Sequence, residues 1–104
     1  MTTQTEQHLR EKLASELGVS TWRGLLPDVL SKSLFHVSAD LDLVEVGVHV
    51  ALDHTGEVKQ WLDSGALKRP SAEEMSQWEK EGSLFRFIVV EPYVFFQEYT
   101  VPQA

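Results

Sequence analysis

Cysteine is absent from the 104 residues of the sequence. Its absence excludes disulfide bonds, thiolate metal ligands and a cysteine nucleophile. Glycine and proline are sparse, at six and four residues, and no segment is repetitive or of low complexity. The sequence also lacks a hydrophobic run long enough to cross a membrane, and its first stretch, "MTTQTEQHLREKLASELG", lacks the apolar centre of a signal peptide. We therefore expect a soluble, cytoplasmic protein without a membrane partner.

Positive charge is scarce as well. Nine lysines and arginines stand against 16 aspartates and glutamates, so the formal net charge is −7. The one pair of adjacent basic residues is Lys68-Arg69. A field of this sign repels phosphate backbones, so we expect no nucleic-acid partner.

The length is that of one domain, so we expect residues 1–104 to form a single domain. Hydrophobic residues make up 42% of the chain and aromatic residues 10%. This composition is sufficient for a packed core and too apolar for a disordered chain.

Apolar residues recur at helical spacing near the start of the chain. In residues 1–18, leucines recur every four residues among charged side chains, which predicts an N-terminal helix from residue 5 to residue 17. The next segment, "STWRGLLPDVLSKS", also has helical spacing after Ser20 or Thr21, either of which can cap a helix. Pro27 lacks a backbone N–H, so this second helix must be short or begin late.

Two later helices have recognisable ends. "TGEVKQWLDSG" places its apolar residues on one helical face, with Thr55 before them and Gly65 after them. Ser71 and Glu74 have the spacing of a capping box, and Gly82 closes the helix that they begin. Both segments predict short, well-delimited helices.

Two segments are typical of strands because they are rich in β-branched and aromatic residues. The first is the short run Leu34–Ser38, and the second is Leu84–Thr100, which bends at Glu91-Pro92. We therefore predict a small α+β domain. About five helices would cover one face of a minimal antiparallel or mixed sheet that these two strands form.

Residues 40–53, "DLDLVEVGVHVALD", fit two structures. As a strand, they place valine and leucine on one face. As a helix, they bring their ionisable residues onto one narrow arc, although Gly47 and four valines disfavour a helix. The residues of this arc are Asp42, Glu45, His49 and Asp53. Periodicity alone leaves both structures open.

The phrases "LDLVEVGVHVALDHTGEVKQWLDSGALKRPS" and "FRFIVVEPYVFFQE" resemble a bacterial family known as domain of unknown function 2288. The resemblance covers residues 20–98 and leaves the N-terminal helix outside. It implies that residues 41–53 are helical, that two further helices follow, and that the second phrase is a strand. It implies no activity, cofactor or catalytic residue.

On the helical interpretation, Glu45, His49 and Asp53 stand one turn apart. Carboxylates and imidazoles at this spacing are how helices present ligands to zinc, manganese or iron, and they can also act as general acids and bases. The alternative is the solvated face of an otherwise buried helix. The isolation of His8 and His36 in the sequence favours this alternative, because a metal site needs ligands from a second segment.

No glycine-rich phosphate loop, nucleophile elbow or HExxH motif is present. The sequence therefore favours a non-enzymatic interaction or regulatory module without a cofactor. The alternative is a protein that binds a metal or a small molecule, or an enzyme, that uses Glu45, His49 and Asp53.

The last segment predicts a homodimer. Because Leu84–Thr100 is much longer than Leu34–Ser38, its second half would lack a partner strand in the same chain. Two copies could pair these free edges across a two-fold axis and bury the aromatic residues between them. The predicted interface consists of Tyr93, Phe95, Phe96 and Tyr99.

Overall fold

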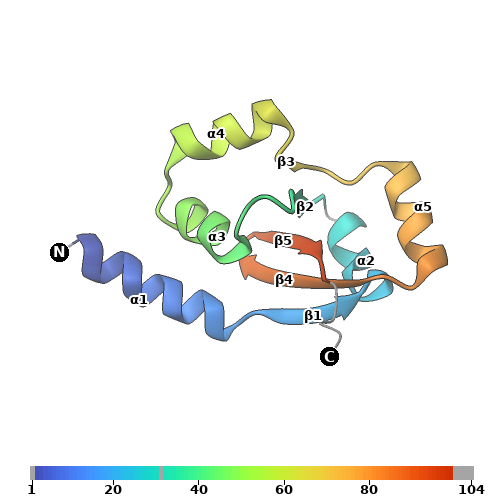
Figure 1. Cartoon of the computed structure of the whole chain (residues 1–104), viewed down its shortest axis with the longest axis horizontal. Coiled ribbons are helices and arrows are strands. Elements are labelled where there is room, and N and C mark those ends of the chain that lie inside the picture. Colours follow the sequence, from blue (N-terminus) through green and yellow to red (C-terminus); the bar gives the residue numbers. More distant parts are fainter. Residues whose placement is uncertain (1, 31, 100–104) are drawn as a thin grey trace.

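The computed structural model describes residues 2–30 and 32–99, except for the side chains of residues 2–4 and 28–30. Figure 1 shows helices packed around a twisted sheet. The helices are α1 (Thr2–Ser15), α2 (Trp22–Leu30), α3 (Leu43–Ala51), α4 (Thr55–Ser64) and α5 (Ala72–Glu81). The strands are β1 (Gly18–Thr21), β2 (Leu34–Val37), β3 (Leu67–Lys68), β4 (Leu84–Val90) and β5 (Tyr93–Glu98). The predicted α+β class is confirmed.

The sheet is larger than the two strands that the sequence predicts. Its order is β1-β4-β5-β2-β3, with β2 and β5 parallel and the other neighbours antiparallel. The segment Leu84–Thr100 forms two strands because the chain reverses at the predicted bend, Glu91-Pro92, through a cis peptide bond. Thr100 lies outside the described residues.

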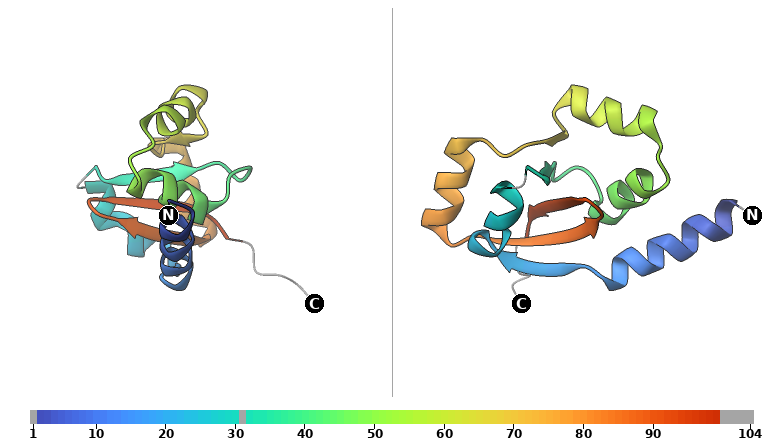
Figure 2. Two further views of the ribbon diagram at one scale, coloured as in Figure 1. Left: turned by 90° about the vertical axis from the view of Figure 1, so that its left-hand side faces the viewer. Right: turned by 180° about the vertical axis from the view of Figure 1, so that it is seen from behind.

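Helices cover both faces of the sheet, so the prediction that they cover one face is wrong. Neighbouring residues of a strand point to opposite faces, and Phe95 and Phe96 of β5 belong to two separate core clusters. Phe96 packs in the cluster that contains Trp22 of α2 and Trp78 of α5. Phe95 packs in the cluster that contains Val46 of α3. Figures 1 and 2 show α2 and α5 beside one end of the β4–β5 hairpin and α3 beside the other, with α4 next to α3 and farther from the hairpin.

The ambiguous segment, residues 40–53, contains the helix α3. Asp42 caps it by accepting hydrogen bonds from the backbone N–H groups of Val44 and Glu45, at 2.9 and 3.2 Å. The valines that also fit a strand pack on the buried side of the helix, since Val46 and Val48 are buried.

The other helix ends agree closely with the sequence. Ser71 and Glu74 form the predicted capping box of α5. Gly65 and Gly82 end α4 and α5 in the left-handed conformation, with φ of 84° and 63°. The start of α4 differs slightly, because His54 rather than Thr55 occupies the N-cap position and its side chain makes no capping hydrogen bond.

Two residues of the predicted dimer interface lie in the core of the single chain. β5 is an inner strand between β4 and β2, and Phe95 and Phe96 are only 2% and 0% exposed. The supposed free edge is therefore already paired. Tyr93 remains exposed, and the ring of Tyr99 lies 5.6 Å from the guanidinium of Arg86.

Candidate functional site

Three of the four ionisable residues of the predicted arc have separate partners for their side chains in the structure. Asp42 caps α3, Glu45 faces α1, and His49 faces His54. Asp53 lies beyond the end of α3 with a φ of +60°. Among the side chains that the structure describes, no group of three or more histidines, aspartates and glutamates is arranged to hold a metal ion.

Glu45 forms a two-pronged ion pair with Arg10 of α1. Nη2 of Arg10 donates to Oε1 of Glu45 at 2.9 Å, and Nε donates to Oε2. The hydrogen bond from Arg10 lowers the pKa of the Glu45 carboxyl below its usual value. The two side chains are 34% and 39% exposed, so the pair lies at the surface. It joins α1 to α3.

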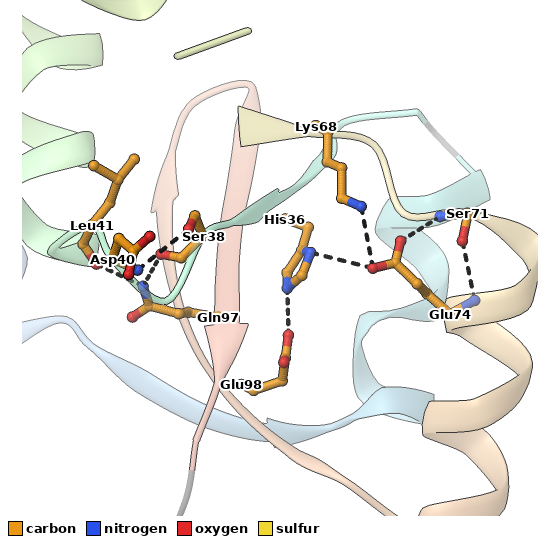
Figure 3. Close-up of polar contacts among 9 residues, drawn as sticks. All are labelled: His36, Ser38, Asp40, Leu41, Lys68, Ser71, Glu74, Gln97 and Glu98. Carbon is orange, nitrogen blue, oxygen red and sulfur yellow. Dashed lines mark hydrogen bonds and ion pairs between the residues drawn. The ribbon is translucent and has the colours of Figure 1, made fainter. Parts of the chain in front are cut away.

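His36 looks isolated in the sequence, but in the structure it contacts two glutamates. Its Nε2 contacts Oε1 of Glu98, and its Nδ1 lies 3.8 Å from Oε2 of Glu74 (Figure 3). Its ring stacks on Phe96, with the two centroids 5.0 Å apart, and meets the ring of Trp78 edge to face at 5.2 Å. Glu98 reaches His36 because the parallel pairing of β2 and β5 places His36 opposite Phe96, two residues before Glu98 on the same face.

Glu74 connects this polar cluster to the start of α5. Its Oε1 accepts from the N–H of Ser71 at 3.0 Å, and Nζ of Lys68 lies 3.3 Å from its Oε2. Burial acts to raise the pKa of Glu74, but the hydrogen bonds from Ser71 and Lys68 outweigh it and lower the pKa. Both ring nitrogens of His36 face carboxylates, so the cluster links the sheet to α5.

Gln97 forms a second internal link. Its side chain is 6% exposed, and its Nε2 donates to the backbone carbonyls of Ser38 and Leu41 at 2.8 and 2.7 Å (Figure 3). These bonds fix the loop between β2 and α3 on β5. The side-chain polar atoms buried in the described part of the chain all have a hydrogen-bond partner.

An apolar groove lies between the end of α3, α4 and the first residue of β5. Its volume is about 290 Å³. Two of its lining residues are large and exposed, Leu62 at 47% and Tyr93 at 41%. The other lining residues are Val50, Asp53, Thr55, Val58 and Lys59. The sequence had singled out both residues. Leu62 belongs to the apolar face predicted for α4, and Tyr93 was predicted as an interface residue.

Two histidines lie close to this groove. Nδ1 of His49 is 2.8 Å from Nδ1 of His54, and the ring of Trp61 meets that of His49 edge to face at 5.4 Å. The sequence places His54 one residue after Asp53, but it gives no indication that the two imidazoles converge.

A family model matches most of the chain. The chain belongs to the family described as "Protein of unknown function (DUF2288)", which it matches over residues 8–98. The solution NMR structure of PA1075 from Pseudomonas aeruginosa is 31% identical in sequence and similar with a TM-score of 0.77, over 93% of this chain and 90% of that chain. No curated protein matches the chain. No helix in the described ranges combines the length and apolar character that a membrane span requires.

Proposed function

We propose that this chain is a non-enzymatic interaction module of the bacterial cytoplasm, which binds a partner protein through the groove between α3, α4 and Tyr93. The observation that carries the proposal is the exposure of Leu62 and Tyr93, which both line one apolar groove. Single exposed apolar residues are ordinary, whereas a group of them around a groove is typical of interaction sites.

The groove offers the kind of contact that stabilises a protein complex. Burying a side chain such as Leu62 contributes about 1.5–3 kcal/mol, before the loss of side-chain freedom is subtracted. Tyr93 adds an aromatic ring whose hydroxyl stays free to hydrogen bond, and tyrosine is enriched at such interfaces. A single apolar side chain of the partner, seated between Leu62 and Tyr93, would bury both.

The charge around the groove indicates the chemistry of the partner. Asp53 lines the groove, and Glu57 and Asp63 of α4 are exposed, against one lining cation, Lys59. The whole chain carries a formal charge of −7. A segment that presents an apolar side chain flanked by lysines or arginines would therefore be complementary in both shape and charge.

The test begins with proteins that the untagged chain retains from a bacterial lysate, followed by purification of each candidate partner. Binding of the purified partner is then measured for the wild-type chain and for the variants Leu62→Lys and Tyr93→Lys. We expect each variant to weaken binding by about tenfold or more, as for a residue at the centre of an interface. We also expect the wild-type affinity to fall as salt is added.

The control variant is Leu26→Lys, since Leu26 of α2 is 37% exposed and does not line the groove. It should bind as the wild type does. If the purified partners bind all three variants equally, or if nothing is retained that binds after purification, the groove is not a docking site.

A further inference from the structure

The end of α3 has the backbone geometry of a Schellman motif. The N–H of His54 donates to the carbonyl of His49 at 2.9 Å, and the N–H of Asp53 donates to the carbonyl of Val50 at 3.1 Å. Asp53 takes the left-handed conformation that the motif requires, with a φ of +60°. The turn therefore holds residues 49 and 54 next to each other through the backbone.

In many Schellman motifs the two side chains brought together in this way form an apolar contact. Here both are histidines, and their Nδ1 atoms converge to 2.8 Å. Trp61 of α4 packs edge to face against the ring of His49, which limits the orientations of that ring. The two imidazoles are thus positioned by a fixed turn and by a neighbouring aromatic ring.

The separation of the two nitrogens is that of a hydrogen bond, and it also matches one kind of metal geometry. Imidazole nitrogens bind divalent transition metals at about 2.0–2.1 Å, so two of them at a right angle lie about 2.8–3.0 Å apart. A tetrahedral angle would require about 3.3–3.4 Å with the same bond lengths. Right-angled nitrogen and oxygen coordination is typical of copper(II) and nickel(II).

The surrounding charges favour a cation. His49 stands in the last turn of α3, where the negative end of the helix dipole lies. Asp53 lies between the two histidines in the sequence and is exposed. The charge of Glu45, one turn before His49, is already paired with Arg10. The formal charge of −7 adds a field of the same sign.

We infer that His49 and His54 form a two-nitrogen site for a divalent transition metal with right-angled coordination, for which copper(II) is the appropriate probe. Water or a partner's side chain completes the coordination. The site differs from the helical arc Glu45, His49 and Asp53, because its second ligand comes from the turn after the helix. It is also independent of the groove residues Leu62 and Tyr93.

The experiment adds copper(II) alone to the untagged full chain and records electron paramagnetic resonance spectra. We expect one copper(II) per chain, with hyperfine coupling to two imidazole nitrogens. His49→Gln and His54→Gln should each weaken binding by about tenfold or more, since the loss of even an outer-shell partner costs this much in metal sites. His8→Gln is the matched control, because His8 is an exposed histidine on α1, and it should bind copper(II) as the wild type does.

A second measurement uses the tryptophan beside the site. Copper(II) quenches nearby fluorescence, and Trp61 contacts His49, whereas Trp22 and Trp78 lie in the core cluster on the other face of the sheet. We expect copper(II) to quench part of the wild-type emission and to have little effect on Trp61→Phe.

Three results would overturn the inference. They are copper(II) bound by a single imidazole, binding that survives His49→Gln and His54→Gln unchanged, and quenching that is equal in the wild type and in Trp61→Phe. Any of them would leave the two rings as a hydrogen-bonded pair.

Discussion

Gln97 shows what a single polar residue does in this sheet. It sits on the inner strand β5, is 6% exposed, and uses its amide to hold the carbonyls of Ser38 and Leu41. A buried carbonyl that loses its donor costs free energy, because it has also lost water. The same residue therefore anchors the loop that leads into α3.

The first prediction concerns the replacement Gln97→Leu, which keeps the approximate size of the side chain and removes its donors. We expect the free energy of unfolding to fall by about 1–3 kcal/mol, because the carbonyl of Leu41 loses this hydrogen bond in a partly buried place. Urea denaturation of the variant and of the wild type measures this difference in the free energy of unfolding.

The control for this prediction is Gln77→Leu. Gln77 is exposed on α5 and bonds only across the surface to Glu81, at 3.2 Å. Its replacement should change the free energy of unfolding by less than about 0.5 kcal/mol. Equal stability of Gln97→Leu and the wild type would contradict the role assigned to Gln97.

Local pairs of residues could be predicted from the sequence, and distant pairs could not. Ser71 and Glu74 are three residues apart, so helix geometry alone brings them together, and the capping box was predicted. His36 and Glu98 are 62 residues apart and meet only through the parallel pairing of β2 and β5. Nothing in either strand specifies that pairing, so His36 looked isolated.

At the scale of elements, the close approach of α3 to β4 explains the glycine inside the helix. A Cβ atom on Gly47 would lie 2.4 Å from Cδ1 of Ile88 and 3.0 Å from Cδ1 of Leu13. Ile88 is fully buried, so it has little room to move. The glycine that disfavours the helix locally is therefore what allows the helix to pack against the sheet.

The second prediction follows from this contact and compares two glycines in helices. Gly47→Ala gains about 1 kcal/mol of helix propensity but overpacks the core, which costs about 1–3 kcal/mol. We expect a net loss of about 1 kcal/mol in the free energy of unfolding, measured by thermal or urea denaturation. Gly56→Ala in α4 has nothing within 4 Å of its new Cβ atom and should instead gain about 0.5 kcal/mol. A stabilised Gly47→Ala variant would show that α3 can shift away from β4.

The strand elements were the hardest to predict. β1 has four residues and β3 has two, which is too short for a periodic pattern to appear. In residues 40–53 the valine alternation was genuine, but a helix that packs on a sheet buries valines equally well. The resemblance to a family, rather than periodicity, favoured the helix there.

At the scale of the whole molecule, the position of β5 at the centre of the sheet determines which surfaces are free. Phe95 and Phe96 contribute to the two core clusters, one on each face. A charged residue at either position should therefore unfold the chain instead of separating two copies. The free edges of the sheet are those of β1 and β3.

The two edges differ in how well they are protected. β3 has only two residues, includes Lys68, and is followed closely by Pro70, all of which discourage pairing with another chain. β1 carries no charged residue and no proline, and its Val19 is 55% exposed. The antiparallel pairing of two β1 strands across a two-fold axis would extend the sheet from one copy to the next.

The last prediction is therefore that the homodimer expected from the sequence forms through β1. Sedimentation equilibrium at micromolar concentration should give twice the chain mass of 11.8 kDa. Val19→Lys places a charge on the free edge and should shift the mass to that of one chain. Val89→Lys is the matched control, because Val89 is 44% exposed on β4 and does not lie on an edge strand, so it should leave the dimer intact. A wild-type mass of one chain would show that the short length of β1 protects the edge by itself, and a dimer that survives Val19→Lys would place the interface on another surface.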